Sequence, residues 1–193
     1  LELDKQNPRY LTLVNRLLNL FENKILGNGN NLVREYLDQS FKPSLVNSFI
    51  IEPGHHYEWA WLLNWSDKIH QRKKYGTLTK TLFDTGWRLG WDFNNGGVFD
   101  EVDCVNNQVS LSTKRFWPLL ELIKVLSVLP GNSHGDDLIS ALTIVLERYI
   151  QPNGIWTERF DQNWTAIDRT MPTSSLYHMA MAILELKERK LKN

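Results

Sequence analysis

The sequence predicts an all-α protein in which three helix pairs follow one another, with short β-hairpins between them. Two observations support this prediction. Apolar residues recur at helical spacing in six separate segments of the chain. A short alternating motif also occurs three times between these segments. Two helices and a short hairpin that recur at a regular interval are typical of helical-repeat architectures.

The six predicted helices have recognisable ends. Pro8 suits the first position of the first helix and Gly27 ends it. Pro53 and Gly54 lead into the second helix, and Asn94-Asn95-Gly96-Gly97 forms a turn that stops the third. In chain order, the helices are expected over about 9–26, 55–70, 78–91, 113–130, 136–150, and from Ser174 or Ser175 into the Lys-rich end.

The repeated motif reads apolar, any residue, acidic, any residue, apolar, Asp. Its copies are Val33–Asp38, Val98–Asp103 and Trp156–Asp161, which begin 65 and then 58 residues apart. The alternation predicts a short strand in each copy. We expect the closing Asp38, Asp103 and Asp161 to stabilise the turns through hydrogen bonds from backbone N–H groups to their side chains.

Composition excludes several classes of function. The 22 basic and 22 acidic residues give a net charge of zero without a basic stripe, which argues against a nucleic-acid partner. No apolar run is long enough to span a bilayer, and no signal peptide opens the sequence. The single cysteine, Cys104, fits a reducing compartment, so we expect a cytoplasmic protein. Eight tryptophans are many for 193 residues; most tryptophans are core residues, but their rings also serve as stacking platforms in sugar sites.

The strongest signal for chemistry is the segment from Glu52 to Leu63. His55 falls in the first turn of the predicted second helix, and Glu58 lies three residues later on the same face. The positive end of the helix dipole disfavours a protonated imidazole there, and a neutral imidazole near a carboxylate can exchange protons near neutral pH. His56 points about 100° away on the helix, and we expect it to be structural.

This segment resembles the hallmark of the N-acylglucosamine 2-epimerase superfamily, particularly its mannose isomerase and mannose-6-phosphate isomerase-like branch. Three further segments match in the family's order, and together they cover most of the chain from about residue 31 to 186. They are Gly96-Gly97-Val98-Phe99-Asp100 with Asp103, Lys114-Arg115-Phe116-Trp117-Pro118 with Glu121, and Pro172-Thr173-Ser174-Ser175-Leu176-Tyr177-His178.

The resemblance implies an (α/α)6 toroid and cofactor-free proton transfer at the carbon next to a sugar carbonyl. His55 and His178 would be the acid and base. Glu58 would bind sugar hydroxyls or orient an imidazole, and Trp117 would form a wall of the sugar site, with Lys114 and Glu121 on the same helix. Asp168 and Arg169 lie in a loop before the last motif and could reach the pocket.

Three helix pairs make half of a six-pair toroid, and the chain begins with Leu1. We therefore expect a single domain over residues 1–193 that corresponds to the C-terminal half of the family's barrel. The family takes further active-site groups from its N-terminal half, so a separate N-terminal half or self-association is an expected partnership. No cofactor and no metal are expected, since the sequence has neither a His-Glu-x-x-His pattern nor a cysteine cluster.

Two other functions stay open at this stage. The same toroid serves glycoside hydrolases and unsaturated glucuronyl hydrolases, for which Glu52 and Glu58 could supply the two carboxyl groups. A non-catalytic remnant that binds sugar is the third possibility. The sequence does not distinguish mannose, mannose 6-phosphate or an N-acyl amino sugar as the substrate.

Overall fold

The computed structural model describes residues 4, 7–26, 31–130, 134–168 and 170–192. Its helices are α1 (Pro8–Leu20, continued by the π-helical turn Phe21–Ile25), α2 (Pro53–Ile69), α3 (Gly76–Gly90), α4 (Phe116–Val128), α5 (Gly135–Ile144, continued by the π-helical turn Val145–Tyr149) and α6 (Ser174–Lys192). The strands are β1 (Ile50–Ile51), β2 (Glu101–Asp103), β3 (Gln108–Leu111), β4 (Lys114–Arg115), β5 (Arg159–Phe160) and β6 (Ala166–Asp168).

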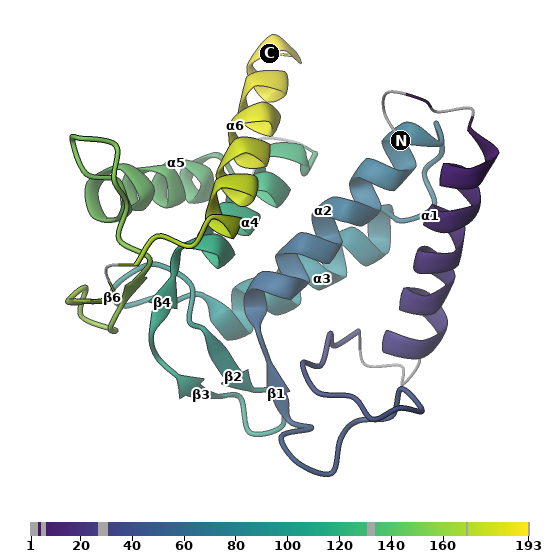
Figure 1. Ribbon diagram of the computed structural model, residues 1–193, viewed down its shortest axis with the longest axis horizontal. Helices are drawn as coiled ribbons and strands as arrows, with labels where there is room; N and C mark the ends of the chain where they lie inside the picture. The colour runs from purple at the N-terminus through teal and green to yellow at the C-terminus, as the bar shows by residue number, and fades with distance from the viewer. Residues whose placement is uncertain (1–3, 5–6, 27–30, 131–133, 169, 193) are drawn as a thin grey trace.

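Three inner helices, α2, α4 and α6, lie side by side, with α4 in the middle. α2 packs against α3 and α4, and α4 packs against α5 and α6. The central position of α4 explains its composition, because nearly every residue from Phe116 to Ser127 is buried. The short strands gather at one end of the helices (Figure 1), where they form the antiparallel sheets β1-β2-β3 and β4-β5-β6.

The expected helices are confirmed, with one change at a boundary. The fourth helix begins at Phe116 and not near Thr113, because Lys114 and Arg115 pair with Phe160 and Arg159 as strand β4. Lys114 is therefore not on the helix that carries Trp117. Gly27, the expected end of the first helix, lies outside the described residues.

The repeated motif forms a strand in two of its three copies. β2 lies in the second copy and β5 in the third, but the first copy makes only an isolated bridge between Leu37 and Pro43. Pro43 has no N–H group to extend the pairing. The turns are as expected in all three copies: Asp38 accepts from the N–H groups of Ser40 and Lys42, Asp103 from Val105 and Asn106, and Asp161 from Asn163 and Thr165.

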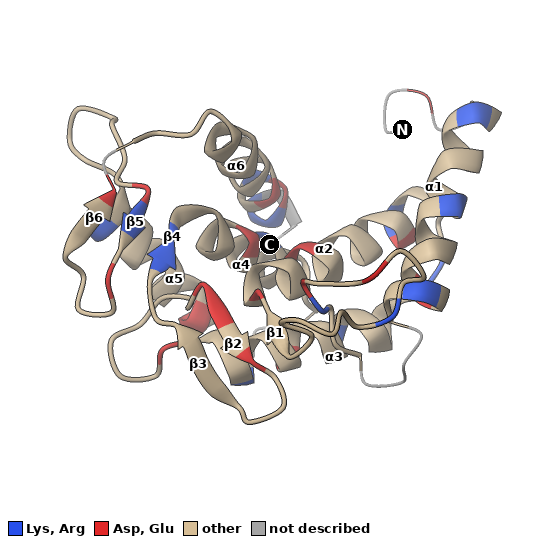
Figure 2. Ribbon diagram, turned by 60° about the horizontal axis from the view of Figure 1, so that its bottom comes forward, with Lys and Arg blue, Asp and Glu red and all other residues tan. Residues whose placement is uncertain are grey.

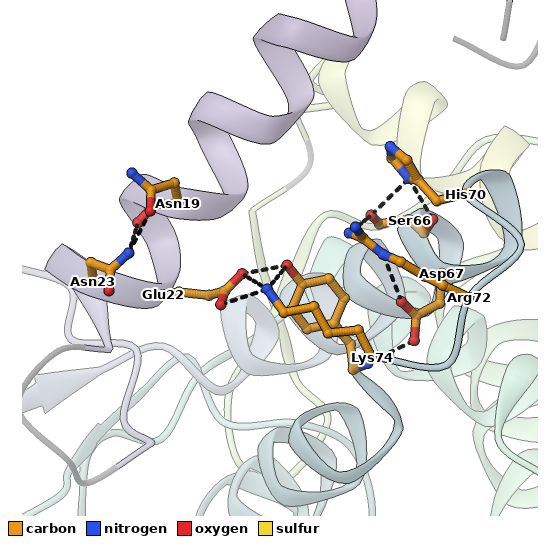
Figure 3. A network of polar contacts seen from close by, with 9 residues as sticks. Asn19, Glu22, Asn23, Ser66, Asp67, His70, Arg72 and Lys74 are labelled. Carbon is orange, nitrogen blue, oxygen red and sulfur yellow. Dashed lines mark hydrogen bonds and ion pairs between the residues drawn. The ribbon is translucent and has the colours of Figure 1, made fainter. Parts of the chain in front are cut away.

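A polar network ties α1 to the turn between α2 and α3 (Figure 3). Glu22, at the end of α1, accepts hydrogen bonds from the ammonium group of Lys74 at 2.8 Å and from the hydroxyl of Tyr75. Asp67, near the end of α2, accepts the backbone N–H of Tyr75 at 2.7 Å and pairs with Arg72 at 3.4 Å. These contacts fix the turn that places α3 against α2.

Candidate active site

The first turns of α2, α4 and α6 surround a cavity of about 470 Å³. Each inner helix contributes from its N-terminal end, and the segment that holds β5 and β6 closes one side. The cavity is lined by His55 and Glu58 from α2, Arg115 and Trp117 at the start of α4, Glu158, Arg159 and Asp168 from the β5–β6 segment, and Pro172, Ser174, Ser175 and His178 from the start of α6.

Gly54 allows α2 and α4 to approach closely at this end. A methyl group at Gly54 would lie 2.5 Å from the outer edge of the Trp117 ring, which no real contact permits. Pro53 occupies the first position of α2, where its missing N–H is of no consequence. The Pro-Gly pair thus starts the helix and also makes room for the indole ring of Trp117.

His55 is held by carboxylates from outside its own helix. Its Nδ1 lies 2.8 Å from Oε2 of Glu35 and 3.9 Å from Oε2 of Glu52. Because a carboxylate only accepts, we assign the proton to Nδ1, which leaves Nε2 for the cavity.

The helix dipole does not decide the protonation of His55, contrary to the expectation from the sequence. Burial lowers the pKa of His55, but the hydrogen bond that His55 donates to Glu35 and the charges of Glu35, Glu52 and Glu58 outweigh burial, and the net pKa is raised. The same hydrogen bond to His55 lowers the pKa of Glu35 against the effect of its own burial.

His178 has a matching arrangement on the other side of the cavity. Its Nδ1 donates to Oε1 of Glu121 at 2.5 Å, which again leaves Nε2 free to face a ligand. Glu121 is fully buried and also lies 2.7 Å from the ammonium group of Lys124. Both candidate histidines are therefore oriented by a carboxylate on Nδ1.

The ring of Trp117 contacts those of both histidines. The centroid of its ring is 4.9 Å from that of His55 and 5.6 Å from that of His178. The ring is partly exposed and lines the cavity, so it offers a flat apolar surface beside two groups able to move protons.

Glu58 completes the set of cavity residues expected from the sequence. Burial and the charge of Glu121 raise its pKa, while Lys124, His55 and His178 act in the opposite direction. One carboxylate oxygen of Glu58, one of Glu121 and one ring nitrogen of His178 all lie within 4.8 Å of one another. Glu58 can therefore accept hydrogen bonds from sugar hydroxyls or help to orient His178.

Two residues expected to bind sugar have other positions. Lys114 has no exposed surface: its ammonium group contacts Oδ2 of Asp92 at 2.8 Å and the backbone carbonyls of Gly96 and Gln162. The expectation for Lys114 is corrected, because this group is occupied in joining two turns. Glu121 does not line the cavity either, and it contacts the ring of His178 at Nδ1.

The acidic position of the repeat identifies site residues that the sequence analysis missed. Glu35 accepts a hydrogen bond from His55 at the start of α2. Asp100 accepts from the backbone N–H of Arg115, which is the N-cap residue of α4. Glu158 accepts from the hydroxyl of Ser175 in α6 at 2.8 Å. Each copy of the repeat thus anchors the inner helix that follows it. The acidic position was visible in the sequence, and only its role was missed.

Two arginines also line the cavity. Arg115 pairs with Glu52 at 2.8 Å and with Asp100 at 3.0 Å, and Arg159 lies 3.6 Å from Asp100. β4 and β5 thereby bring basic residues next to acidic ones at this end of the molecule (Figure 2). Asp168 lines the cavity, whereas Arg169 lies outside the described residues.

The position of Glu52 weakens the hydrolase alternative. Its carboxylate is engaged by Arg115 and does not line the cavity, so Glu52 and Glu58 do not face each other across a substrate. His56, expected to be structural, is fully buried, and its Nε2 accepts the backbone N–H of Val33 at 3.2 Å. Burial lowers the pKa of His56 to about 4, which keeps its ring neutral.

Among the described residues, two groups of side chains have the donor spacing of a metal site: Glu35, Glu52 and His55, and Glu58, Glu121 and His178. Each group already contains or touches a basic side chain, Arg115 beside Glu52 and Lys124 beside Glu121. A cation bound there would compete with a charge that the protein supplies itself. We therefore assign a metal to neither group.

Comparison with known proteins places this site in context. The family model described as N-acylglucosamine 2-epimerase (GlcNAc 2-epimerase) matches residues 1–182. The chain is 25% identical, over 193 residues, to a mannose-6-phosphate isomerase of Rhizobium meliloti (strain 1021), with 93% of this chain and 48% of that protein covered. It therefore spans about half the length of this relative.

Solved structures give the same picture. The crystal structure of a D-mannose isomerase superposes with a TM-score of 0.81 at 23% identity and covers 95% of this chain and 51% of the other. A sugar epimerase from a ruminal bacterium gives 0.79 at 16% identity, with 97% and 50% covered. The expected fold class, about three helix pairs of the (α/α)6-toroid type, is confirmed. In the part of the chain that the structure describes, no helix is long and apolar enough to cross a membrane.

Proposed function

Since the chain belongs to the N-acylglucosamine 2-epimerase family, we propose that it carries the proton-transfer site of a sugar isomerase or 2-epimerase. The observation that supports this most is the pair of histidines on separate inner helices, both in contact with Trp117 and both lining the cavity. Each ring is fixed through Nδ1 by a carboxylate, so each presents Nε2 as a group able to accept or donate a proton.

The proposed chemistry needs only these groups. In aldose–ketose isomerisation, one histidine removes the proton from C2, and the electron pair of that bond forms the C1–C2 double bond while the carbonyl oxygen takes a proton from the other histidine. The resulting enediol is then protonated at C1 and loses the proton of its C2 hydroxyl, which gives the ketose. Epimerisation instead returns the proton to C2 from the opposite face.

The remaining cavity residues would hold the sugar. Trp117 offers a face for stacking, and the carboxylate of Glu58 offers acceptors for sugar hydroxyls. The expectation that no cofactor takes part stays a prediction, and so does a cytoplasmic location. A mannose-type sugar is the substrate class suggested by the curated relative, whose described substrate is mannose 6-phosphate.

We also propose that the chain corresponds to the C-terminal half of a toroid and that a second helical half completes it. About half of each compared protein is covered. Two helices at the flanks of the molecule expose apolar residues: Tyr10, Leu13 and Leu17 on α1, and Leu176, Tyr177, Ile183 and Leu184 on α6. Another half could cover these residues.

The test is proton NMR of the purified chain with mannose, and separately with mannose 6-phosphate, in D2O. Appearance of fructose or of its 6-phosphate, or deuterium at C2, would establish enediol chemistry and show that this chain suffices. A folded chain without exchange at any such sugar would contradict sufficiency, and cleavage of a glycoside would contradict the proposed reaction.

The two histidines give the sharpest variant test. Replacing His55 or His178 by Ala should lower kcat/KM by about 10²–10⁴-fold, the usual contribution of a general acid or base. His134→Ala is the matched control, because His134 lies at the start of α5 and bonds to Asp137 at 2.9 Å. Activity that survives in His55→Ala or His178→Ala would remove that residue from the mechanism.

A further inference from the structure

Lys124 occupies a place where an ammonium group is costly. It lies in the middle of α4 with no exposed surface, and its Nζ is 3.8 Å from the centroid of the Trp61 ring and 5.6 Å from that of Tyr177. Aromatic faces attract a cation, but they do not replace its hydration. The carboxylate of Glu121, 2.7 Å away, supplies the opposite charge.

Glu121 is shared between two groups. Its Oε1 faces Nζ of Lys124 and also accepts the Nδ1–H of His178 at 2.5 Å. Its Oε2 has no hydrogen-bond partner among the described residues. One buried carboxylate therefore stands between an ammonium group and the imidazole of His178.

The charge of this cluster depends on Lys124. A buried carboxylate next to an imidazole strongly favours the protonated ring, because the two charges then cancel. Here Lys124 already cancels the charge of Glu121, so a second proton on His178 would leave the cluster with an excess positive charge. Glu58 from α2 and Tyr177 from α6 are also near this ring, and burial raises the pKa of both, which favours their neutral forms. The charged residues that line the same cavity from other elements are Arg115, Glu158, Arg159 and Asp168.

His55 has no counterpart of Lys124. Among the described residues, the ion pair of Glu35 is with His55 itself, and Arg115 binds Glu52 and Asp100. Glu58 is near both histidines and does not distinguish them. The two histidines thus have the same hydrogen bond on Nδ1, but only the carboxylate that holds His178 has a lysine as a second partner.

We propose that Lys124 is a positioning residue that, by neutralising Glu121, keeps the ring of His178 unprotonated, so that His178 takes the substrate proton while His55 supplies one. The effect of Lys124 on the ring of His178 can be measured in the folded chain without any substrate. The assignment of base and acid rests on the proposed function.

The first experiment follows the histidine ring protons by NMR as a function of pH, with the His178 signal assigned by its loss in His178→Gln. In Lys124→Met, which keeps the length of the side chain, the titration midpoint of His178 should move up by at least about one pH unit. An unchanged or lower midpoint would overturn the proposal.

Glu121→Gln gives a second test with the opposite sign. It removes the carboxylate and leaves the ammonium group of Lys124 near His178, so the midpoint should move down. A purely structural role for the pair does not predict opposite shifts. If Lys124→Met fails to fold, an unchanged or higher midpoint in Glu121→Gln overturns the proposal.

Lys114→Met is the matched control, because Lys114 is another fully buried lysine with a carboxylate partner, Asp92, at 2.8 Å. It should leave the His178 midpoint unchanged.

The kinetic arm separates this proposal from the proposed function. In Lys124→Met, the acid limb of kcat/KM should move to higher pH by the same interval as the NMR midpoint, which is at least about a tenfold loss at pH values below both midpoints that is recovered at higher pH. A chain that shows the NMR shifts without turning over sugar would support the role of Lys124 and contradict the proposed activity. A chain that turns over sugar without the NMR shifts would support the proposed activity and contradict the role of Lys124.

Discussion

At the scale of single residues, the pairing of Glu35 with His55 couples the site to pH. The pKa of His55 is raised above its ordinary 6.5 and that of Glu35 is lowered below its ordinary 4.5. Stabilisation from His55 is fully present below about pH 6.5 and is lost as the pH rises through its folded pKa. Stabilisation from Glu35 is present above about pH 4.5 and is lost as the pH falls through its folded pKa.

Glu35→Gln should therefore lower the free energy of unfolding most between about pH 4.5 and 6.5. The expected loss is about 0.5–1.5 kcal/mol, since both side chains are partly exposed and solvent screens the pair. Urea unfolding at pH 3, 5.5 and 9 measures it, with Glu147→Gln on the surface after α5 as the control. A loss of equal size at all three pH values would contradict the pairing as its cause.

At the scale of elements, glycines set the distance between α2 and α3. A methyl group at Gly90 would lie 2.2 Å from Cβ of Pro53, and one at Gly86 would lie 2.8 Å from the ring of Tyr57. Both glycines are on α3, one turn apart, and face α2. The start of α2, and with it His55, is therefore positioned by the absence of side chains on its neighbour.

Gly90→Ala should destabilise the protein by about 1–3 kcal/mol, because the added methyl group forces apart two packed helices. Gly76→Ala, at the other end of the same helix, meets no atom within 4 Å and should be neutral or slightly stabilising. Urea unfolding followed by tryptophan fluorescence compares the two. Equal effects would show that helix propensity, and not the contact with Pro53, decides the outcome.

The elements differ in how far the sequence could predict them. The helices were predictable because their apolar spacing and their Pro and Gly ends are local signals. β1 and β4 were not, since each has two residues and exists only through pairing with a distant strand. The same division holds in the site. His55 and Trp117 lie in recognisable sequence motifs. The contact between Glu35 and His55 joins residues 20 positions apart in the chain, and it is visible only in the fold.

At the scale of the whole molecule, the apolar faces of the flanking helices decide its behaviour in solution. Ile183 and Leu184 are 58% and 53% exposed on α6, next to each other and one turn or more beyond His178. Exposed apolar surface of this kind promotes association. The isolated chain should therefore self-associate when no second half is supplied.

Sedimentation velocity at increasing protein concentration tests this. The chain should form species larger than a monomer, and the double variant Ile183→Glu, Leu184→Glu should remain monomeric because it places charges on the contact face. Ile139→Glu, on the 63% exposed Ile139 of α5, is the control and should leave association unchanged. A chain that stays monomeric at every concentration would refute the docking role of α6.

The anchoring of each inner helix by the repeat before it has a consequence for the order in which the protein is made. Synthesis runs from the N-terminus, so Glu35 leaves the ribosome before α2, Asp100 before α4, and Glu158 before α6. Each helix thus emerges into a solution where its anchor is already present. Each inner helix can therefore meet its anchor as soon as it emerges, and its packing against later helices follows.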